Sequence, residues 1–401
     1  MKKVDIVGVG IICSAARNYA ELKDYLQEEK SAVYYESSMA AAGALITNFN
    51  FLDELARLSI PPEIFDKAKK YANRQSLATQ TAIIAALQAW CSAGFFSQQP
   101  DLQKVSLIIA GDNFNQNEMQ SLSREWSVNK KISPSYAAKF MDSNLLGIIS
   151  ELLSIQGEGF TIGAASASGN VGIIAGARQV EHSYGDACLV VAPMMELSEI
   201  ELTAFKRLGV LATKEELRGS FDQHRSGFFY GQGSGAMVLV KHNEGHQGIS
   251  IEGYSLKLDG NSGTDPSLLG EIKVMQSAIE DAGLLPEEIK YVNAHATGSI
   301  LGDEIELQAL AEVFGDSSID INCSKSMLGH CLSAAGMIES IAVMAQFELN
   351  FFHPNFYLLN PVAVANTLSV TAKGKKEAVL NRILKNSFGF SGINSCIIYA
   401  A

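Results

Sequence analysis

A serine near the middle of the chain occupies a position suited to a nucleophile or an oxyanion site. The segment GFTIGAASASGNVGIIAGARQV, residues 159–180, reads as a short strand, a run of small residues and an apolar helix whose first turn would hold Ser166 or Ser168. A side chain there gains from the helix dipole, and free backbone N–H groups can stabilise an oxyanion. The alternative interpretation is that the serine only caps the helix.

Two histidines lie in turns rich in Gly, Ser and Thr at the ends of expected strands. His295 follows the strand-like YVNA, and His330 follows a strand and a small-residue turn that carries Lys325. Sites in α/β proteins gather at such strand ends. Neutral imidazoles can donate hydrogen bonds to developing negative charge, so the pair favours a catalytic site over two isolated structural histidines. We expect the other five histidines to be solvated: His182, His224, His242, His246 and His353.

The elements that must position these residues follow an α/β pattern. Short runs rich in Val and Ile, such as VDIVGVGII and ACLVVAP, alternate with longer stretches of helical period. The stretch 71–91 is apolar over its later half, which predicts a helix enclosed inside the protein. A weak internal echo pairs SLIIAGDN with YVNAHATG and TIGAASASGN with DINCSKSMLGH, and favours a duplication. The polar segment 242–248 would divide the chain into parts 1–243 and 244–401.

Composition excludes several classes of function. The chain has 401 residues with 31 basic and 43 acidic side chains, a net charge of −12, which disfavours binding to nucleic acid. Its six cysteines form no CxxC pair and are interpreted as reduced thiols, and no cluster has metal-ligand spacing. The opening MKKVDIVGVGII is interpreted as a strand rather than a signal peptide, and no stretch has the continuous apolarity of a membrane span. These features predict a cytoplasmic protein.

Three motifs resemble those of the β-ketoacyl synthases. HATGSILGDEIE at 295–306, SKSMLGHCLSAAG at 324–336 and NSFGFSGIN at 386–394 match the family patterns His-Gly-Thr-x-Thr-x-x-Gly-Asp-x-x-Glu, Ser-Lys-x-x-x-Gly-His-x-x-x-Ala-Ala-Gly and Asn-Ser-Phe-Gly-Phe-Gly-Gly. The resemblance extends over the whole chain. It implies a thiolase-like fold of two duplicated α/β halves in αβαβα layers, a homodimer, no bound cofactor, and a substrate carried on the phosphopantetheine of an acyl carrier protein.

One departure from the family changes the expected reaction. Elongating members have Cys in Ala-Cys-x-Ser-Gly, and this chain has Ser166 at that position. A serine hydroxyl needs a positioned base to accept an acyl group, whereas enolate formation from a malonyl thioester needs only hydrogen-bond donors. The chain therefore resembles the ketosynthase-like decarboxylases of polyketide β-branching cassettes, which convert malonyl-carrier protein to acetyl-carrier protein for a hydroxymethylglutaryl-synthase-like partner.

The resemblance also assigns roles to individual residues. His295 and His330 would hold the thioester oxygen, with Lys325 beside them, and Phe390 would be the gatekeeper and lend a backbone N–H to the oxyanion hole. Thr297 and Ser299 would bind the pantetheine amides; the alternative is that they only stabilise the turn. Ala296 and Ser391 replace family glycines and are expected to narrow the site, and Gln232 replaces a glutamate.

An acidic enzyme needs local positive charge to attract an acidic carrier protein. The candidate docking residues form three basic clusters, of which each could equally be an ordinary solvated surface: Lys67, Lys70 and Arg74; Lys130 and Lys131; Lys206 and Arg207. Two alternative functions stay open. One is an elongating synthase or acyltransferase that uses Ser166 as nucleophile, and the other is a non-catalytic subunit similar to a chain-length factor.

Overall fold

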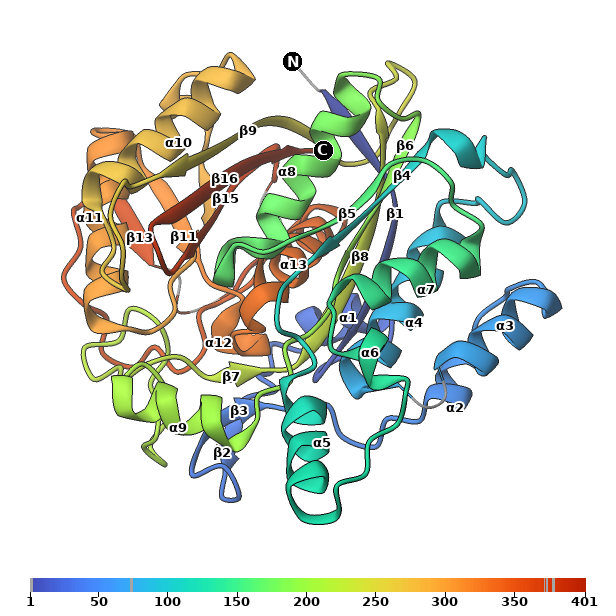
Figure 1. Ribbon diagram of the computed structural model, residues 1–401. Coiled ribbons are helices and arrows are strands. Elements are labelled where there is room, and N and C mark those ends of the chain that lie inside the picture. Colours follow the sequence, from blue (N-terminus) through green and yellow to red (C-terminus); the bar gives the residue numbers. More distant parts are fainter. Residues whose placement is uncertain (1–2, 73–74, 371, 373, 377–378) are drawn as a thin grey trace.

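A single large sheet runs through the protein. The computed structural model describes residues 3–72, 75–370, 372, 374–376 and 379–401. Within these residues, eleven strands form one sheet in the order β13-β11-β10-β15-β16-β9-β1-β8-β6-β4-β5 (Figure 1). Their bounds are β1 Val4–Cys13, β4 Val105–Ala110, β5 Gly159–Ile162, β6 Ala187–Ala192, β8 Gly233–Lys241, β9 Ser250–Leu258, β10 Tyr291–Asn293, β11 Ile319–Asn322, β13 Leu368–Val370, β15 Arg382–Gly389 and β16 Ile393–Ala400.

The strand order repeats. In the first five strands, β1 pairs antiparallel with β8, β8 antiparallel with β6, β6 parallel with β4, and β4 parallel with β5. The same pairing recurs through β9, β16, β15, β10 and β11, with β13 added at the outer edge. The two segment pairs of the sequence echo occupy equivalent positions, at β4 and β10 and at β5 and β11.

The two sets of strands meet at a short junction. β1 and β9 pair only through Val4 with Ile251 and Asp5 with Ser250. The expected division between residues 243 and 244 falls in the segment that joins β8 to β9. That each part is a separate domain stays a prediction.

Helices form three layers around the two sets of strands, which confirms the predicted αβαβα arrangement (Figure 1). α8 (Ser168–Glu181) and α13 (Ala335–Leu349) lie between the sets, α4 (Leu77–Ser92) and α7 (Ser143–Leu153) cover one outer face, and α10 (Leu268–Ala282) and α11 (Ile300–Phe314) lie on the other side. The remaining helices are α1 Tyr19–Gln27, α2 Phe51–Ala56, α3 Pro62–Ala72, α5 Gln116–Asn129, α6 Tyr136–Lys139, α9 Glu199–Leu208, α12 Lys325–Leu328, η1 Leu102–Lys104, η2 Ala165–Ala167, η3 Pro286–Glu288 and η4 Leu332–Ala334.

Two small sheets complete the secondary structure. One contains three strands in the order β2-β3-β7, and the other pairs β12 with β14. Their bounds are β2 Tyr34–Glu36, β3 Ala41–Ala44, β7 Tyr230–Gly231, β12 Phe351–Phe352 and β14 Lys375–Lys376.

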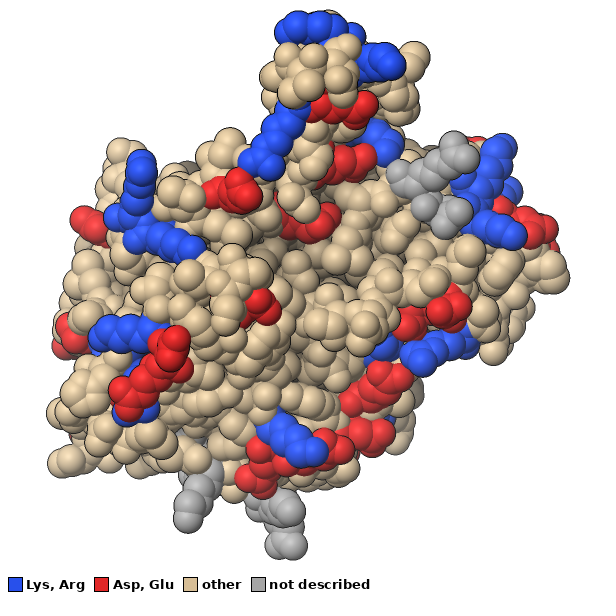
Figure 2. Space-filling view, turned by 90° about the horizontal axis from the view of Figure 1, so that it is seen from below, with Lys and Arg blue, Asp and Glu red and all other residues tan. Residues whose placement is uncertain are grey.

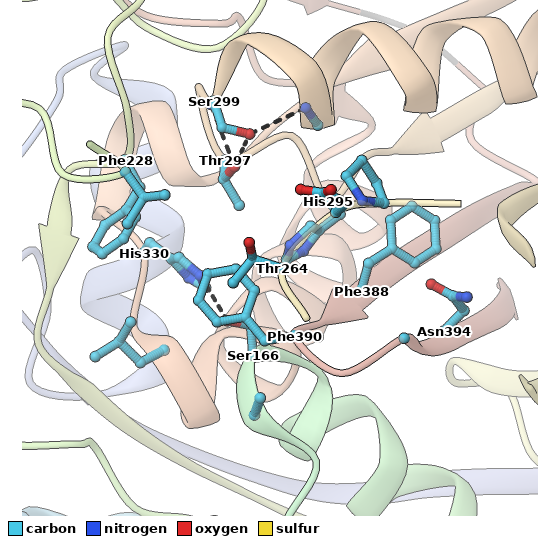
Figure 3. A pocket seen from close by; sticks show the side chains of 18 of the residues that line it. Ser166, Phe228, Thr264, His295, Thr297, Ser299, His330, Phe388, Phe390 and Asn394 are labelled. Carbon is cyan, nitrogen blue, oxygen red and sulfur yellow. Dashed lines mark hydrogen bonds between the residues drawn. The ribbon is translucent and has the colours of Figure 1, made fainter. Parts of the chain in front are cut away.

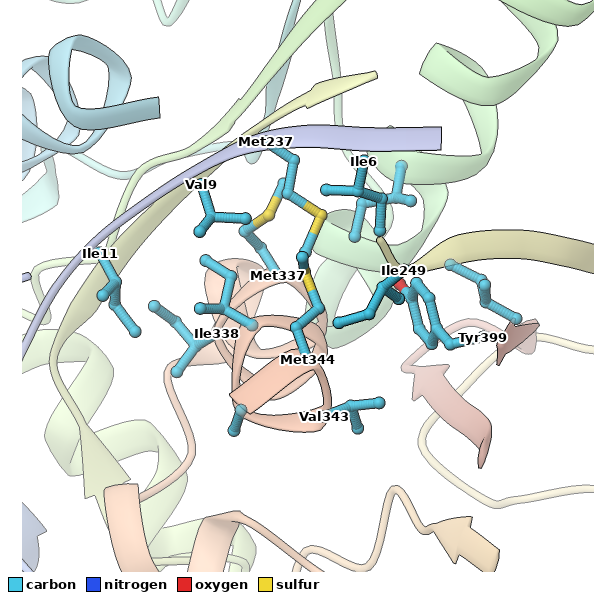
Figure 4. Packing of buried hydrophobic residues seen from close by; sticks show 14 of the residues in the cluster. Ile6, Val9, Ile11, Met237, Ile249, Met337, Ile338, Val343, Met344 and Tyr399 are labelled. Atoms are coloured by element: carbon cyan, nitrogen blue, oxygen red, sulfur yellow. The ribbon is translucent and has the colours of Figure 1, made fainter. Parts of the chain in front are cut away.

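The largest apolar cluster fills the space between the two sets of strands. Figure 4 shows Val9 of β1 and Met237 of β8 facing Met337, Ile338 and Met344 of α13. All residues of α13 from Ala335 to Phe347 are buried, the polar Glu339, Ser340 and Gln346 among them, as expected for a helix enclosed on all sides. Of the described residues, only the stretch Leu332–Leu349 is long and apolar enough to span a membrane, and it is this buried core helix.

The helix expected at 71–91 is enclosed as predicted, but it begins later. Ser76 caps α4 by accepting a hydrogen bond from the Thr79 backbone N–H, so the helix starts at Leu77. Gly8 and Gly10 let β1 approach it closely, because a Cβ at Gly10 would lie 2.0 Å from the Ala85 carbonyl oxygen. Close packing therefore explains these two glycines.

One expectation about the histidines was wrong. His353 is fully buried rather than solvated, and its Nε2 lies 3.0 Å from Ser324 Oγ. Burial holds the pKa of its imidazole down at about 4. Its immediate neighbours Phe352 and Pro354 are apolar, but the hydroxyl that makes burial of the ring possible comes from Ser324, almost thirty residues away in the sequence.

Candidate active site

A cavity of about 600 Å³ lies where the ends of β4, β5, β10 and β11 converge. Its lining combines polar groups from these strand ends with an apolar wall (Figure 3). Residues that line the cavity include Ser166, Glu271, His295, Ala296, Thr297, Ser299, Glu306, His330, Phe388, Phe390 and Asn394. The chain thus brings together the serine and the two histidines that the sequence singled out.

Ser166 lies in the short helix η2 between β5 and α8. Ala165 before it has a φ of +48°, in the left-handed region, so the chain turns sharply at this point. The next serine along, Ser168, accepts from the Ala164 backbone N–H at 2.8 Å and donates to the Ala165 carbonyl at 2.7 Å. The two serines therefore divide the functions that the sequence left open: Ser168 stabilises the turn, and Ser166 lines the cavity.

His330 contacts Ser166 directly. Its Nε2 lies 3.0 Å from Ser166 Oγ, whereas its buried Nδ1 has no hydrogen-bond partner (Figure 3). Its backbone N–H donates to the Phe229 carbonyl at 2.6 Å, and the Phe228 ring packs edge-on at 5.2 Å between centroids. Orphaned buried N–H donors are rarer than unsatisfied acceptors, so we assign the proton to Nε2. In that tautomer His330 can donate into the cavity.

His295 is fixed through its backbone and its Nδ1. Glu306 on α11 accepts from the backbone N–H groups of His295 and Ala296 at 2.8 and 2.7 Å. The Lys325 ammonium donates to the His295 carbonyl at 2.5 Å and lies 3.4 Å from its Nδ1. Because an ammonium only donates, Nδ1 must be the acceptor and the proton of the neutral ring must be on Nε2. The rings of His295 and His330 are 5.8 Å apart between centroids.

Both imidazoles are neutral at pH 7. Burial holds the pKa of His295 and that of His330 well below the ordinary value, because the charged ring would lose its hydration. The nearby Lys325 and Lys385 ammonium groups lower the pKa of both rings further. The site therefore presents two neutral N–H donors to one cavity.

Lys325 lies behind the histidines and does not line the cavity. Its ammonium is 2.5 Å from Glu339 Oε1, and its side chain is only 3% exposed. Burial lowers the pKa of Lys325, but Glu339, Cys323 and Glu306 together raise it more, so the net shift is upward and the lysine stays charged. Lys325 therefore contacts His295 and does not reach the cavity itself.

The acidic positions of the motifs are structural. Besides Glu306 and Glu339, Asp303 accepts from the backbone N–H groups of Phe221 at 2.9 Å and Gly298 at 3.0 Å and pairs with Arg225 at 3.2 Å. Burial raises the pKa of Asp303 to about 7. None of the three forms a catalytic carboxylate pair with another.

Phe390 stands on the turn between β15 and β16. Its side chain is 38% exposed and lines the cavity above Ser166 (Figure 3). The turn lies close to the serine turn, because a Cβ on Gly389 would meet the Ala164 carbonyl oxygen at 2.5 Å. Ser387 Oγ also donates to the Ser166 carbonyl at 3.2 Å. The turn that carries Phe390 therefore packs directly against the turn that carries Ser166.

Of the two residues expected to narrow the site, only Ala296 lines the cavity. Ala296 adopts a φ of +33°. Ser391 has a φ of +69° but is exposed and does not line the cavity, so its expected narrowing effect was wrong. The turn at β15 and β16 directs its side chain outward.

Thr297 and Ser299 line the cavity and also stabilise the turn that carries them. Thr297 Oγ1 donates to Ser299 Oγ at 3.2 Å. Ser299 Oγ also accepts from the Gly302 backbone N–H at 3.2 Å and so caps α11. Turn stabilisation and contact with an entering ligand are compatible here.

The sequence did not single out a buried glutamate on the cavity wall. Glu271 on α10 is 1% exposed, and its Oε2 has no hydrogen-bond partner. Burial raises the pKa of Glu271 well above the ordinary value, and the carboxylates of Glu306 and Asp259 raise it further. Asp259 itself accepts from Asn394 Nδ2 at 2.6 Å. Glu271 lies on an otherwise amphipathic helix, so its position in the sequence resembles that of a surface glutamate.

The basic clusters lie on separate elements. Lys67 and Lys70 belong to α3, Lys130 and Lys131 follow α5, and Lys206 and Arg207 end α9, whose Phe205 and Leu208 line the cavity. The Lys206 ammonium donates to the Met39 carbonyl. Arg74 lies outside the described residues. Figure 2 shows the Lys and Arg side chains of one face in small groups beside Asp and Glu, not as one continuous basic surface.

Comparisons with known proteins find β-ketoacyl synthases and related enzymes that match almost the whole chain. Residues 1–245 match the model of the β-ketoacyl synthase N-terminal domain, and residues 249–358 match that of the C-terminal domain. The polyketide biosynthesis malonyl-ACP decarboxylase PksF of Bacillus subtilis is 34% identical over 99% of this chain and 96% of its own length. The 3-oxoacyl-[acyl-carrier-protein] synthase 1 of Escherichia coli is 27% identical over 99% of this chain and 98% of its own length.

Solved structures show the same fold. A β-ketoacyl synthase from Burkholderia phymatum superposes with a TM-score of 0.86 at 22% identity, covering 100% of this chain and 99% of that one. The ishigamide ketosynthase/chain length factor gives a TM-score of 0.86 at 23% identity, covering 100% and 99%.

Proposed function

The chain belongs to the β-ketoacyl synthase family, and from this we propose that it is a malonyl-acyl carrier protein decarboxylase of polyketide biosynthesis. The family membership and the thiolase-like fold expected from the motifs are both confirmed. The observation that carries the proposal is a pair of neutral imidazoles, those of His295 and His330, that line one cavity. The same cavity is lined by the hydroxyl of Ser166 instead of a thiol.

The reaction needs an electron sink. As the bond between the malonyl methylene carbon and its carboxylate breaks, CO2 leaves and the bonding electron pair passes into the thioester carbonyl, which becomes an enolate oxygen. N–H donors fixed beforehand at that oxygen stabilise the enolate without reorganisation. Nε2 of His295 and Nε2 of His330 supply them. Addition of a proton to the methylene carbon then gives the acetyl thioester.

The phosphopantetheine of the carrier protein delivers the malonyl group. Thr297 and Ser299 lie on the cavity wall beside His295 and offer hydroxyl groups to the amides of the arm. Phe390, half-exposed at the same cavity, is placed to act as the gatekeeper and to present its backbone N–H near the thioester. No other cofactor is needed for this chemistry.

A second function, acyl transfer through Ser166, is favoured by the 3.0 Å contact with His330 Nε2. A serine nucleophile needs a base that a third group orients. Among the described residues, no carboxylate or carbonyl contacts His330 Nδ1, so the third group is missing. Ser166 is therefore better suited to shape the cavity and to hydrogen-bond than to attack. A non-catalytic role, like that of a chain-length factor, would not need two neutral histidines in one cavity.

Intact-mass spectrometry of both proteins tests the proposal. We expect malonyl-loaded carrier protein to lose the mass of CO2 while the enzyme stays unmodified, and His295→Ala to be slower by about 10²- to 10³-fold. An acyl mass on the enzyme would instead establish Ser166 as a nucleophile. No change on either protein would favour the non-catalytic subunit.

We also propose a pathway partner, a location and an oligomeric state for this protein. Its product would be used by a hydroxymethylglutaryl-synthase-like partner in a β-branching cassette. The protein would be cytoplasmic and would form a homodimer. The dimer is supported by large apolar side chains that α5, α6 and the segments beside them leave exposed: Trp126, Val128, Ile132, Phe140 and Met141. A second copy packed there would remove them from water. Light scattering that gives a monomer at micromolar concentration would contradict the dimer.

A further inference from the structure

A lysine of the last pair of long strands is completely buried. The Lys385 side chain on β15 has 0% exposure, its ammonium lies 2.6 Å from Glu339 Oε2, and it also donates to the Asn386 carbonyl. Lysine is almost never buried so fully unless it is paired. In the sequence, Lys385 is the single charged residue of the otherwise uncharged run that follows Arg382.

Lys385 belongs to a chain of charges that ends at the catalytic imidazole. Glu339 lies between the two lysines, with Oε1 at 2.5 Å from Lys325 and Oε2 at 2.6 Å from Lys385. Lys325 in turn contacts the carbonyl and the Nδ1 of His295. Lys385 therefore acts on His295 through two ion pairs, without lining the cavity itself.

The charges behind the histidines balance only if Lys385 is included. Glu306 places a second carboxylate on the backbone N–H groups of His295 and Ala296 and interacts electrostatically with both lysines. Two ammonium groups thus face two carboxylates. The titratable groups that interact with the two imidazoles, or with the lysines and carboxylates behind them, are Glu271 of α10, Asp303 and Glu306 of α11, Cys323, Lys325 of α12, Cys331, Glu339 of α13, His353, Lys385 of β15 and Cys396 of β16.

Without Lys385, one ammonium would face two carboxylates. The resulting negative charge would lie beside the cavity in which an enolate must form, and in a buried site such a charge is poorly screened. It would oppose the developing negative charge and would favour protonation of the histidines. The buried Lys385 ammonium therefore compensates carboxylate charge near the cavity, which an apolar side chain of similar size could not do.

We propose that Lys385 is a positioning residue for decarboxylation, which keeps His295 and His330 as neutral donors by balancing the Glu306 and Glu339 carboxylates. This inference rests on the proposed function. Lys385 lies outside the cavity and compensates the negative charge next to the site at which the enolate forms.

Steady-state kinetics of two variants test the charge. In Lys385→Met, which keeps an unbranched side chain that is one atom shorter, we expect kcat for malonyl-carrier protein to fall by about tenfold or more with KM unchanged, because Lys385 acts through His295 and does not line the cavity. The rate should also become dependent on pH between about 5 and 7, where histidine normally titrates. The double variant Lys385→Met with Glu339→Gln removes one charge of each sign and keeps an oxygen that can accept from Lys325. It should recover much of the lost rate.

The outcomes separate charge from packing. A double variant no faster than Lys385→Met, or a Lys385→Met enzyme with normal kcat and pH profile, would overturn the proposal. A wild-type enzyme that turns over no malonyl-carrier protein would instead refute the proposed function.

A measurement on the unmodified protein keeps the test valid if Lys385→Met does not fold or the enzyme has no turnover. NMR titration of the His295 and His330 ring carbons should show both rings neutral at pH 6. Titration of either ring near 6.5 would contradict the role of Lys385.

Discussion

Ser166 Oγ and His330 Nε2 lie 3.0 Å apart, in a contact that resembles a nucleophile and its base but lacks the group that would orient the base. His330 Nδ1 is buried and has no partner, whereas Nδ1 of His295 lies 3.4 Å from the Lys325 ammonium. The two rings thus line the same cavity, but only the His295 ring has a contact at its Nδ1. The geometry is suited to donation by both rings more than to proton abstraction by one.

Removal of the serine hydroxyl tests this assignment. In Ser166→Ala we expect decarboxylation to continue within about tenfold of the wild-type rate, because enolate stabilisation needs the two imidazoles and no nucleophile. Loss of a true serine nucleophile typically costs about 10⁶-fold in kcat. Release of CO2 from malonyl-carrier protein measures the rate, and a variant as inactive as His330→Ala would show that Ser166 attacks the thioester.

A thiol at the same position should behave differently. Ser166→Cys would place sulfur next to His330 and at the start of α8, where the helix N-terminus favours the thiolate. We expect an acyl-loaded carrier protein to transfer its acyl group to this variant, visible as an added mass on the enzyme. Ser168→Cys is the matched control, because Ser168 is fully buried and faces the turn. Equal acylation of both variants, or of neither, would contradict the prediction.

The depressed histidine pKa values predict the dependence of the reaction on pH. Since burial and the two lysines lower the pKa of both rings, His295 and His330 stay neutral as the pH falls through 6.5. The rate of decarboxylation should therefore be level between pH 8 and about pH 6. A fall in kcat with a midpoint near 6.5 would mean that a histidine of ordinary pKa controls the reaction. Circular dichroism over the same range controls for unfolding.

Glu271 should make the protein less stable as the pH rises. Its carboxyl has a pKa raised by burial and by Glu306 and Asp259, so the folded protein holds a proton that the unfolded chain loses above about 4.3. The stability contributed by that proton is complete at low pH and decreases by about 1.4 kcal/mol per pH unit until the folded group ionises.

Glu271→Gln, which is neutral at every pH, should therefore stabilise the fold more at pH 8 than at pH 5. Thermal unfolding of both proteins at the two pH values measures the difference. An increment in Tm that is equal at pH 5 and pH 8 would show that Glu271 has an ordinary pKa in the fold.

Carrier-protein docking is expected to depend on Lys67 and Lys70. Reversal of both charges, Lys67→Glu with Lys70→Glu, should raise KM for malonyl-carrier protein several-fold at low salt and leave kcat unchanged, because exposed charges act mainly on encounter. Lys104→Glu is the control, since Lys104 lies just before β4, at the end of that strand opposite the cavity. A KM that neither the reversal nor salt alters would exclude docking at α3.

The sequence alone determined the class of fold, the family and three residues, Ser166, His295 and His330, that line the cavity. The alternation of buried strands with helices indicated the layers, and the turns that carry Ser166, His295 and His330 were recognisable because local motifs encode strand ends. Even the duplication was visible, since equivalent strands end in similar turns. Strands, turns and motifs of this kind are each encoded by a short stretch of chain, so they can be predicted from the local sequence.

Only the tertiary structure decided how charges and exposures are distributed. That Ser168 bonds the turn while Ser166 lines the cavity depends on one left-handed residue, Ala165. The burial of His353, Glu271 and Lys385 could not be predicted, because burial depends on which distant segments pack against a side chain and not on its sequence neighbours. The electrostatics of the site therefore come from the meeting of segments that are far apart in the chain.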